Sequence, residues 1–258
     1  MTARIFIATA VATLALSAGV AHAADTAKAD APTVVIVHGA FADGSDWSRV
    51  IPYLQAKGIK VTAVQNGLDS LSGDVAAAQR AIANAPGRVV LVGHSWGGTV
   101  ITQAGNDPKV AALVYVAAFA PDAGQSTADQ GTQYPVPEGI KHLQADAAGY
   151  LSLSADGVAS YFAQDLPRAR TDVMAATQGP IQSKAFGEKV TAAAWSTRPN
   201  WYIVSSSDRM IQPDLERDYA KKLNAKTTVL PSSHVPQQSH PEDVAKVIID
   251  AVQTVAAK

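Results

Sequence analysis

The sequence predicts an α/β protein: a mainly parallel sheet of about six strands, flanked by helices and carrying a helical lid insertion. Short apolar runs rich in β-branched residues alternate with amphipathic stretches, which indicates βαβ units. The 258 residues suit one large α/β domain or two small ones, and are ample for a buried core. One long stretch breaks the alternation, and this stretch predicts the insertion.

The composition excludes several classes of protein. An apolar share of 47% is ordinary for a globular domain and excludes a disordered chain. The 21 basic and 22 acidic residues give a net charge of -1 and no basic stripe, so we expect no nucleic-acid partner. Because the chain contains no Cys, disulfides, thiolate nucleophiles and zinc–thiolate sites are excluded as well.

The first 23 residues have the three-part pattern of a secretory signal peptide. Arg4 supplies a positive start, residues 5–20 form an apolar run, and Ala21-His22-Ala23 is a cleavage site of the small-x-small type. A membrane anchor is the alternative, but a span needs about 20 apolar residues. We therefore expect cleavage after Ala23, a mature chain without a membrane span, and a periplasmic or secreted location.

Six apolar runs predict the strands. The first, TVVIV, is a continuous β-branched run, which is typical of a strand buried on both faces. The runs RVVLV and VAALVYV have the same character. The six predicted strands are 33–37, 60–64, 88–92, 110–116, 201–205 and 227–230.

Amphipathic stretches between these runs predict the helices. The first ends before Gly58 and the second before Pro86-Gly87, which are helix stop signals. For the last helix, Ser239 is the expected N-cap, and Glu242 would complete a capping box. The predicted helices are 47–57, 72–85, a helix from Gly93 to about 106, 213–223 and 241–255.

Residues 121–195 contain no convincing buried strand and are rich in Ala, Gln, Gly, Pro and Asp. Two helical patterns occur in this stretch, at 157–164 and 167–178. A disordered loop is the alternative, but structureless loops of this length are rare in compact domains. We expect a helical lid over the carboxyl ends of the strands, where open α/β sheets bind ligands. Residues 24–258 would then form one domain with this insertion.

A candidate nucleophile lies in Gly93-His94-Ser95-Trp96-Gly97. A bare G-x-S-x-G is weak evidence, but this one follows an apolar strand directly and opens a helix, as a nucleophile elbow requires. The glycines suit a turn too sharp for side chains. The sequence therefore predicts that the Ser95 hydroxyl is held clear of the sheet, at the positive end of a helix.

A serine hydroxyl needs a base to accept its proton. His234 lies in the loop after the last predicted strand, over the edge where the site is expected. His240 lies in the first turn of the last helix, where a structural role suffices, so His234 is the favoured base. The remaining histidines have structural or signal-peptide interpretations: His22, His38, His94 and His142.

The imidazole needs a carboxylate to fix its tautomer. Asp208 follows a predicted strand at its carboxyl end and is the favoured acid. Asp122, which follows the fourth strand, is the main rival. Asp214 and Glu216 lie in the first turn of the next helix, where acids are common because of the helix dipole.

Four segments in order give the mature chain a resemblance to the α/β-hydrolase superfamily. They are VHGAF with Gly44 and Trp47, then VGHSWGG, SSSDRMIQP and SSHVPQQSHPEDVA. The chain order Ser95, Asp208, His234 is also that of α/β-hydrolases. The resemblance is to the small esterase branch related to plant methylesterases and hydroxynitrile lyases. It implies that the backbone N–H groups of Ala40 and Trp96 form the oxyanion hole.

Two activities and one inactive alternative follow. The first is hydrolysis of a small-molecule carboxylic ester through an acyl-enzyme on Ser95. The second is carbon–carbon lysis of the hydroxynitrile type, against which Val235 argues because those relatives carry Lys after the catalytic His. The third is a binding protein without activity. No metal or organic cofactor is expected, because ligand clusters and a dinucleotide-binding motif are missing from the sequence.

The pocket itself is less defined by the sequence. Phe41 is the favoured substrate-binding residue, because it lies beside the expected oxyanion hole. Other aromatic side chains are candidates for lining an apolar acyl or alcohol pocket, with a packing role as the favoured alternative for each: Trp96, Tyr134, Tyr150, Tyr161, Phe162 and Trp195.

Overall fold

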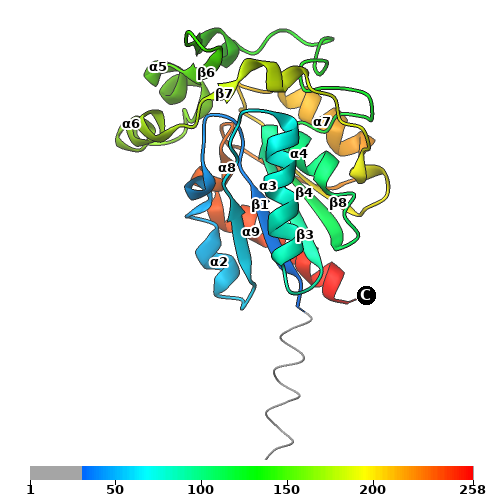
Figure 1. The fold of residues 1–258 in the computed structure, drawn as a ribbon. Helices are drawn as coiled ribbons and strands as arrows, with labels where there is room; N and C mark the ends of the chain where they lie inside the picture. Colours follow the sequence, from blue (N-terminus) through cyan, green and yellow to red (C-terminus); the bar gives the residue numbers. More distant parts are fainter. Residues whose placement is uncertain (1–30, 258) are drawn as a thin grey trace, which may run out of the picture.

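A six-stranded sheet, in the order β2-β1-β3-β4-β8-β9, forms the centre of the computed structural model, which describes residues 31–257 (Figure 1). All neighbouring strands in it pair in parallel. The α/β prediction and its six strands are therefore confirmed, whereas the expected signal peptide, residues 1–23, lies outside the described residues. The strands are β1 (Thr33–Val37), β2 (Val61–Val64), β3 (Val89–Ser95), β4 (Val110–Ala118), β8 (Asn200–Ser205) and β9 (Lys226–Leu230).

Helices cover both faces of this sheet (Figure 1). On one face lie α3 (Leu71–Asn84), α4 (Trp96–Ala104) and α7 (Pro213–Lys222). On the other lie α2 (Ile51–Gln55) and α9 (Pro241–Ala256). A short helix, α8 (Pro236–Ser239), precedes α9, and a 3-10 turn, η1 (Gly44–Trp47), precedes α2.

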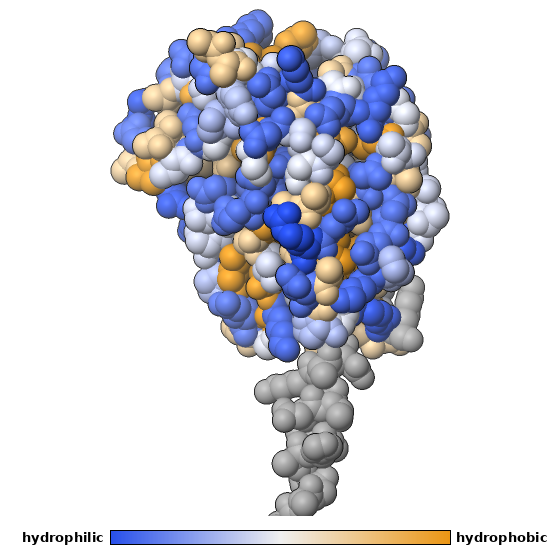
Figure 2. Space-filling model, in the orientation of Figure 1, coloured by the Kyte–Doolittle hydropathy of each residue, from blue (hydrophilic) through white to orange (hydrophobic). Residues whose placement is uncertain are grey.

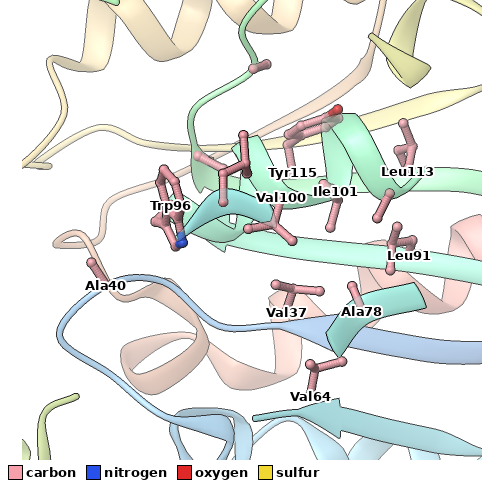
Figure 3. Close-up of a cluster of buried hydrophobic side chains, with 14 of the residues drawn as sticks. Val37, Ala40, Val64, Ala78, Leu91, Trp96, Val100, Ile101, Leu113 and Tyr115 are labelled. Carbon is pink, nitrogen blue, oxygen red and sulfur yellow. The ribbon is translucent and has the colours of Figure 1, made fainter. Parts of the chain in front are cut away.

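The central strands β1, β3, β4 and β8 supply side chains to two separate hydrophobic cores, because successive residues point to opposite faces. Val35 and Leu91 lie in the core under α3 and α4, whereas Val34 and Val90 lie in the core under α9. Figure 3 shows the first core, in which side chains of the strands meet those of the two helices. Burial of each such large aliphatic side chain contributes about 1.5–3 kcal/mol, so both faces of the sheet are held firmly.

Residues 121–195 lie across the carboxyl ends of the strands, above the sheet in Figure 1. The expected helices are present, as α5 (Ala155–Gly157) continued by the π-helical turn η3 (Val158–Phe162), and as α6 (Arg168–Thr177). Short 3-10 turns lie between these elements: η2 (Glu138–His142), η4 (Ser183–Gly187) and η5 (Ala194–Ser196).

The insertion also contains three short strands, which the sequence analysis did not predict because it found no convincing buried strand there. It carries a small antiparallel sheet in the order β5-β6-β7, with β5 at Leu143–Ala145, β6 at Tyr150–Leu153 and β7 at Ile181–Gln182. Its strands have only three, four and two residues and are partly exposed. Such short runs have too little periodicity to be recognised, and β7 pairs with a strand far away in the sequence.

Two predicted helix starts also differ. Ser239 is not an N-cap: it ends α8, and His240 precedes α9 without a side-chain cap. Glu242 instead pairs with Lys246, 3.0 Å away. The expected helix 47–57 is divided into η1 and the shorter α2, which has Pro near its start. The first residues of α2 and α9 are therefore set by the turns that precede these helices rather than by the local sequence pattern.

The surface that Figure 2 shows is mainly hydrophilic, with apolar side chains in small separate patches. No helix within residues 31–257 combines the length and the apolar character that crossing a membrane requires.

Candidate active site

Ser95 lies at the junction of β3 and α4, in a backbone conformation that side chains rarely adopt. Its φ is 50° and its ψ is −119°. Residues held in such conformations cluster at functional sites, because the surrounding structure must maintain the strain. Here the constraint is the abrupt change from a buried strand to a helix, which turns Ser95 toward the carboxyl edge of the sheet.

The elbow depends on two glycines. A Cβ on Gly93 would lie 2.5 Å from the Gly97 carbonyl oxygen, and a Cβ on Gly97 would lie 2.4 Å from the Val37 carbonyl oxygen. Both contacts are with backbone atoms, which cannot swing aside. The close approach of β1, β3 and α4 therefore requires glycine at both positions.

We predict that Gly97→Ala is less stable than wild type by about 1–3 kcal/mol, because the added methyl group clashes with backbone. The helix preference of Ala offsets at most about 1 kcal/mol of this cost. Gly187→Ala is the matched control, since a methyl group at that position would have no other atom within 4 Å. Urea unfolding measures both, and equal stability of the two variants would contradict the steric argument.

His234 and Asp208 form a buried hydrogen-bonded pair. His234 Nδ1–H donates to Asp208 Oδ2 at 2.5 Å, and both side chains are almost fully inaccessible. Asp208 Oδ1 accepts from the backbone N–H groups of Met210 and Ile211, at 2.6 and 2.9 Å. Backbone donors thus fix the Oδ1 atom of the carboxylate, and its Oδ2 atom orients the imidazole.

The His94 side chain contacts the backbone of the loop that carries His234. Its Nε2 lies 2.8 Å from the His234 carbonyl oxygen. Burial, and then the neighbouring His234, hold the pKa of His94 well below its ordinary value. The His94 ring is therefore neutral and donates through Nε2–H, which positions the backbone that carries His234.

The rival candidates lie elsewhere. Asp122 forms a partly exposed ion pair with Lys222 at 3.3 Å. His240 Nδ1 lies 2.9 Å from the Ser239 hydroxyl, in the turn before α9. Of the acids that the sequence proposes, Asp208 is the one that reaches His234 in the described structure.

Ser95 and His234 both line a cavity of about 570 Å³ between the sheet and the insertion. The described residues that line it include no Asp, Glu, Lys or Arg. Its walls are largely apolar, and they come from both the sheet edge and the insertion: Ala40, Phe41, Phe119, Tyr134, Val136, Ile140, Leu143, Leu151, Phe162, Phe186, Met210, Ile211 and Leu215. The cavity therefore offers an approaching molecule apolar surface and, among these residues, no acidic or Lys/Arg side chain.

The aromatic expectations are met in part. Phe41, Tyr134 and Phe162 line the cavity. Phe41 has a φ of 61°, and its ring meets that of Phe162 edge-on at 6.5 Å. Phe119 and Phe186 also line it, although the sequence did not single them out.

The other expected aromatic residues serve packing. Tyr150 donates to Asp69 at 2.5 Å, and Trp195 donates to the Pro121 carbonyl at 3.0 Å. The ring of Tyr161 stacks on that of His142. The Trp96 side chain is fully buried and does not line the cavity. These four side chains therefore follow the packing alternative, because each finds a partner away from the cavity.

The two expected oxyanion-hole residues lie close to Ser95: Trp96 follows it in the chain, and Ala40 belongs to a neighbouring loop. A Cβ on Gly39, which precedes Ala40, would lie 2.9 Å from Ser95 Cβ, so the two loops touch. Among the backbone hydrogen bonds of turns, loops and helix caps within residues 31–257, none has the Ala40 N–H or the Trp96 N–H as its donor. The Trp96 indole Nε1–H donates to buried Asp74 at 2.8 Å, which fixes this residue at the start of α4.

A buried polar network that the sequence did not predict joins the insertion to the loop of His234. Asp46 accepts from Gln237 Nε2 at 2.6 Å and from Gln238 Nε2 at 2.9 Å. Arg170 of α6 donates to Gln238 Oε1 at 2.9 Å. Burial raises the pKa of Asp46, while its two amide partners oppose this effect. The network holds α8, which follows His234 directly, against both the sheet and the insertion.

Groups of three His, Asp or Glu side chains that could hold a metal ion do not occur in the described part of the chain.

Comparison with known proteins adds the following findings. A family model described as the alpha/beta hydrolase family matches residues 34–247. A pyrethroid hydrolase of Sphingobium wenxiniae is 29% identical over 252 residues, covering 84% of this chain and 86% of that protein. Methylesterase 2 of Arabidopsis thaliana is 25% identical over 219 residues, covering 71% and 81%.

Solved structures show the same architecture. The crystal structure of polyneuridine aldehyde esterase superimposes with a TM-score of 0.76 and covers 86% of this chain and 99% of that one. At 18% sequence identity, this likeness supports the fold alone.

Proposed function

Because the chain belongs to the alpha/beta hydrolase family and is an esterase-like hydrolase, we propose that it cleaves carboxylic esters through an acyl-enzyme on Ser95. His234 would act as the base and Asp208 as the acid that orients it. The observation that carries this proposal is the 2.5 Å hydrogen bond between His234 and Asp208, beside a cavity that His234 shares with Ser95.

The geometry suggests the following course. Ser95 Oγ attacks the ester carbonyl carbon while His234 Nε2 accepts its proton. The backbone N–H groups of Ala40 and Trp96 stabilise the oxyanion, each by about 3 kcal/mol. His234 then returns the proton to the departing alcohol. Water, activated by the same imidazole, hydrolyses the acyl-enzyme.

The lining of the cavity favours uncharged, apolar esters. A bound carboxylate would lose its hydration without meeting a cation among the described lining residues, which costs several kcal/mol. The names of the relatives, a pyrethroid hydrolase and a methylesterase, are consistent with neutral ester substrates.

We predict that kcat/KM for an aryl hexanoate exceeds that for a mono-aryl adipate by at least about 100-fold, because of this desolvation cost. The two esters share the leaving group and the length of the acyl chain, and differ in the terminal carboxylate. Initial rates of aryl alcohol release measure the ratio. Equal values would show that the acyl group does not enter the cavity.

The main alternative is a lyase of the hydroxynitrile type. The residue after His234 is Val235, whose buried hydrocarbon side chain has no amine to supply to the site. Turnover of mandelonitrile without hydrolysis of a chromogenic ester would favour the lyase. Turnover of neither substrate would favour a binding protein.

We also propose that the protein is exported, with residues 1–23 removed as a signal peptide. The support is the sequence pattern alone. N-terminal sequencing of the protein recovered from outside the cytoplasm should begin at Ala24. An intact Met1 on the functional protein would contradict export by this route.

A further inference from the structure

Glu216 is a fully buried acid directly behind the proposed triad. It lies in the first turn of α7, and its side chain is inaccessible to solvent. Glu216 Oε2 accepts from the backbone N–H of Ser205 at 2.9 Å. Its other oxygen, Oε1, is equally buried and has no donor among residues 31–257. One oxygen of this carboxyl group is therefore placed to carry a proton.

The neighbours of Glu216 do not neutralise a charge on it. The nearby cation, Arg217, is half exposed and pairs with Asp214 at 2.9 Å. Tyr202 on β8 faces Glu216, and burial raises the pKa of this tyrosine well above its ordinary value, so it stays neutral. The remaining neighbour is Asp208, because one residue, Ser205, binds both acids. The Asp208 N–H donates to the Ser205 carbonyl oxygen at 3.2 Å, and the Ser205 N–H donates to Glu216 Oε2 at 2.9 Å.

An ionised Glu216 would be a buried charge beside a second carboxylate, without a cation. Either condition alone costs several kcal/mol. Burial, and then the charge of Asp208 and the hydrogen bond to it, hold the pKa of Glu216 well above its ordinary value. A protonated Glu216 must donate, and the Asp208 carboxylate is the acceptor within reach.

We propose that Glu216 is a protonated carboxylic acid that donates a hydrogen bond to Asp208 and so positions the carboxylate that orients His234. Asp208 would then be held by three donors besides His234: the N–H groups of Met210 and Ile211 on Oδ1, and Glu216. Glu216 does not touch the substrate and acts only through Asp208. The catalytic consequence rests on the proposed function, whereas the shared proton does not.

The proposal predicts a pH dependence whose sign follows from the two states of Glu216. The unfolded chain ionises Glu216 near its ordinary pKa, and the folded protein ionises it only at higher pH. Between these values the folded state binds one more proton, so this contribution to stability falls as pH rises. The groups that face Glu216 are Asp208, Tyr202 and Arg217, and burial holds the pKa of Tyr202 well above its ordinary value.

Two substitutions separate the donor from the bulk of the side chain. Glu216→Gln keeps an amide N–H for Asp208 and an oxygen for Ser205, whereas Glu216→Leu keeps neither. We expect kcat of Glu216→Gln to stay within a few-fold of wild type. We expect kcat of Glu216→Leu to fall by up to about 100-fold with KM little changed, because a misplaced triad slows chemistry rather than binding.

Two measurements do not depend on activity. The wild-type-minus-Glu216→Gln infrared difference spectrum at neutral pH should contain the C=O stretch of a protonated carboxylic acid. The melting temperature of Glu216→Gln relative to wild type should rise with pH, because the substituted chain lacks the titrating group. Absence of both signals would overturn the proposal, and so would equal kcat losses in folded Gln and Leu variants.

These readouts also distinguish this proposal from the proposed function. If Ser95→Ala remains active, the serine mechanism fails, but the infrared band still decides whether Glu216 is protonated. If the band is absent while Ser95→Ala is inactive, the mechanism stands and the carboxyl pair fails. Should Glu216→Leu not fold, the spectrum and the pH dependence of Glu216→Gln decide the question.

Discussion

Replacing Ser95 with alanine should lower kcat for ester hydrolysis by at least about 10⁴-fold, because the acyl-enzyme cannot form without the hydroxyl. His234→Ala should cost nearly as much, and the double variant little more than either single one. This non-additivity follows because the hydroxyl attacks only as its proton leaves for the imidazole. Steady-state rates of the three variants with one neutral aryl ester measure it.

The control for Ser95→Ala is Ser126→Ala. Ser126 is buried like Ser95, but its hydroxyl donates to Asp129 and it does not line the cavity. Ser126→Ala should keep its activity within a few-fold. Substantial turnover by Ser95→Ala, or labelling by a phosphonate ester at another serine, would refute the proposed nucleophile.

Asp208→Asn should lower kcat by up to about 10⁴-fold while the fold persists, because the amide no longer holds the imidazole in its productive tautomer. The structure supplies a matched comparison, since Asp122 was the rival in the sequence. Asp122→Asn removes only a partly exposed ion pair with Lys222, for which about 0–1 kcal/mol of stability is typical. Its activity should be close to wild type.

A pH profile and a thermal melt of both variants separate catalysis from stability. If Asp122→Asn were the crippling change and Asp208→Asn mild, the assignment of the acid would be wrong. A loss of activity in Asp208→Asn with an equal loss of folded protein would instead point to a structural role for the Asp208 side chain.

The sheet was predictable because its strands carry a local signal. A strand buried on both faces needs apolar residues at every position, and TVVIV and RVVLV meet that requirement within five residues each. The helix ends were less predictable. Ser239 ends the short helix α8, so the N-cap position of α9 is His240 instead of the expected Ser239. The position of α8 depends in turn on the loop that carries His234.

The candidate site divides in the same way. Ser95 belongs to a local motif. Both glycines of this motif are required, because a Cβ at either position would lie 2.4 or 2.5 Å from a backbone oxygen atom. Phe119 and Phe186 carry no such signal, although they line the cavity. Whether an aromatic residue faces a cavity depends on how segments far apart in the sequence come together, and the composition of the segment does not reveal it.

By itself, the sequence determined the α/β class, the six parallel strands and the elbow at Ser95, because each depends on residues that are neighbours along the chain. Only the tertiary structure decided that Asp208, rather than Asp122, meets His234. It also decided that Glu216, which the sequence places in an ordinary helix start, is fully buried and bound to the backbone of Ser205, as Asp208 is. Burial and pairing at such positions depend on packing between α7, β8 and the loop after β9, and residues that are distant in sequence acquire their charge states only there.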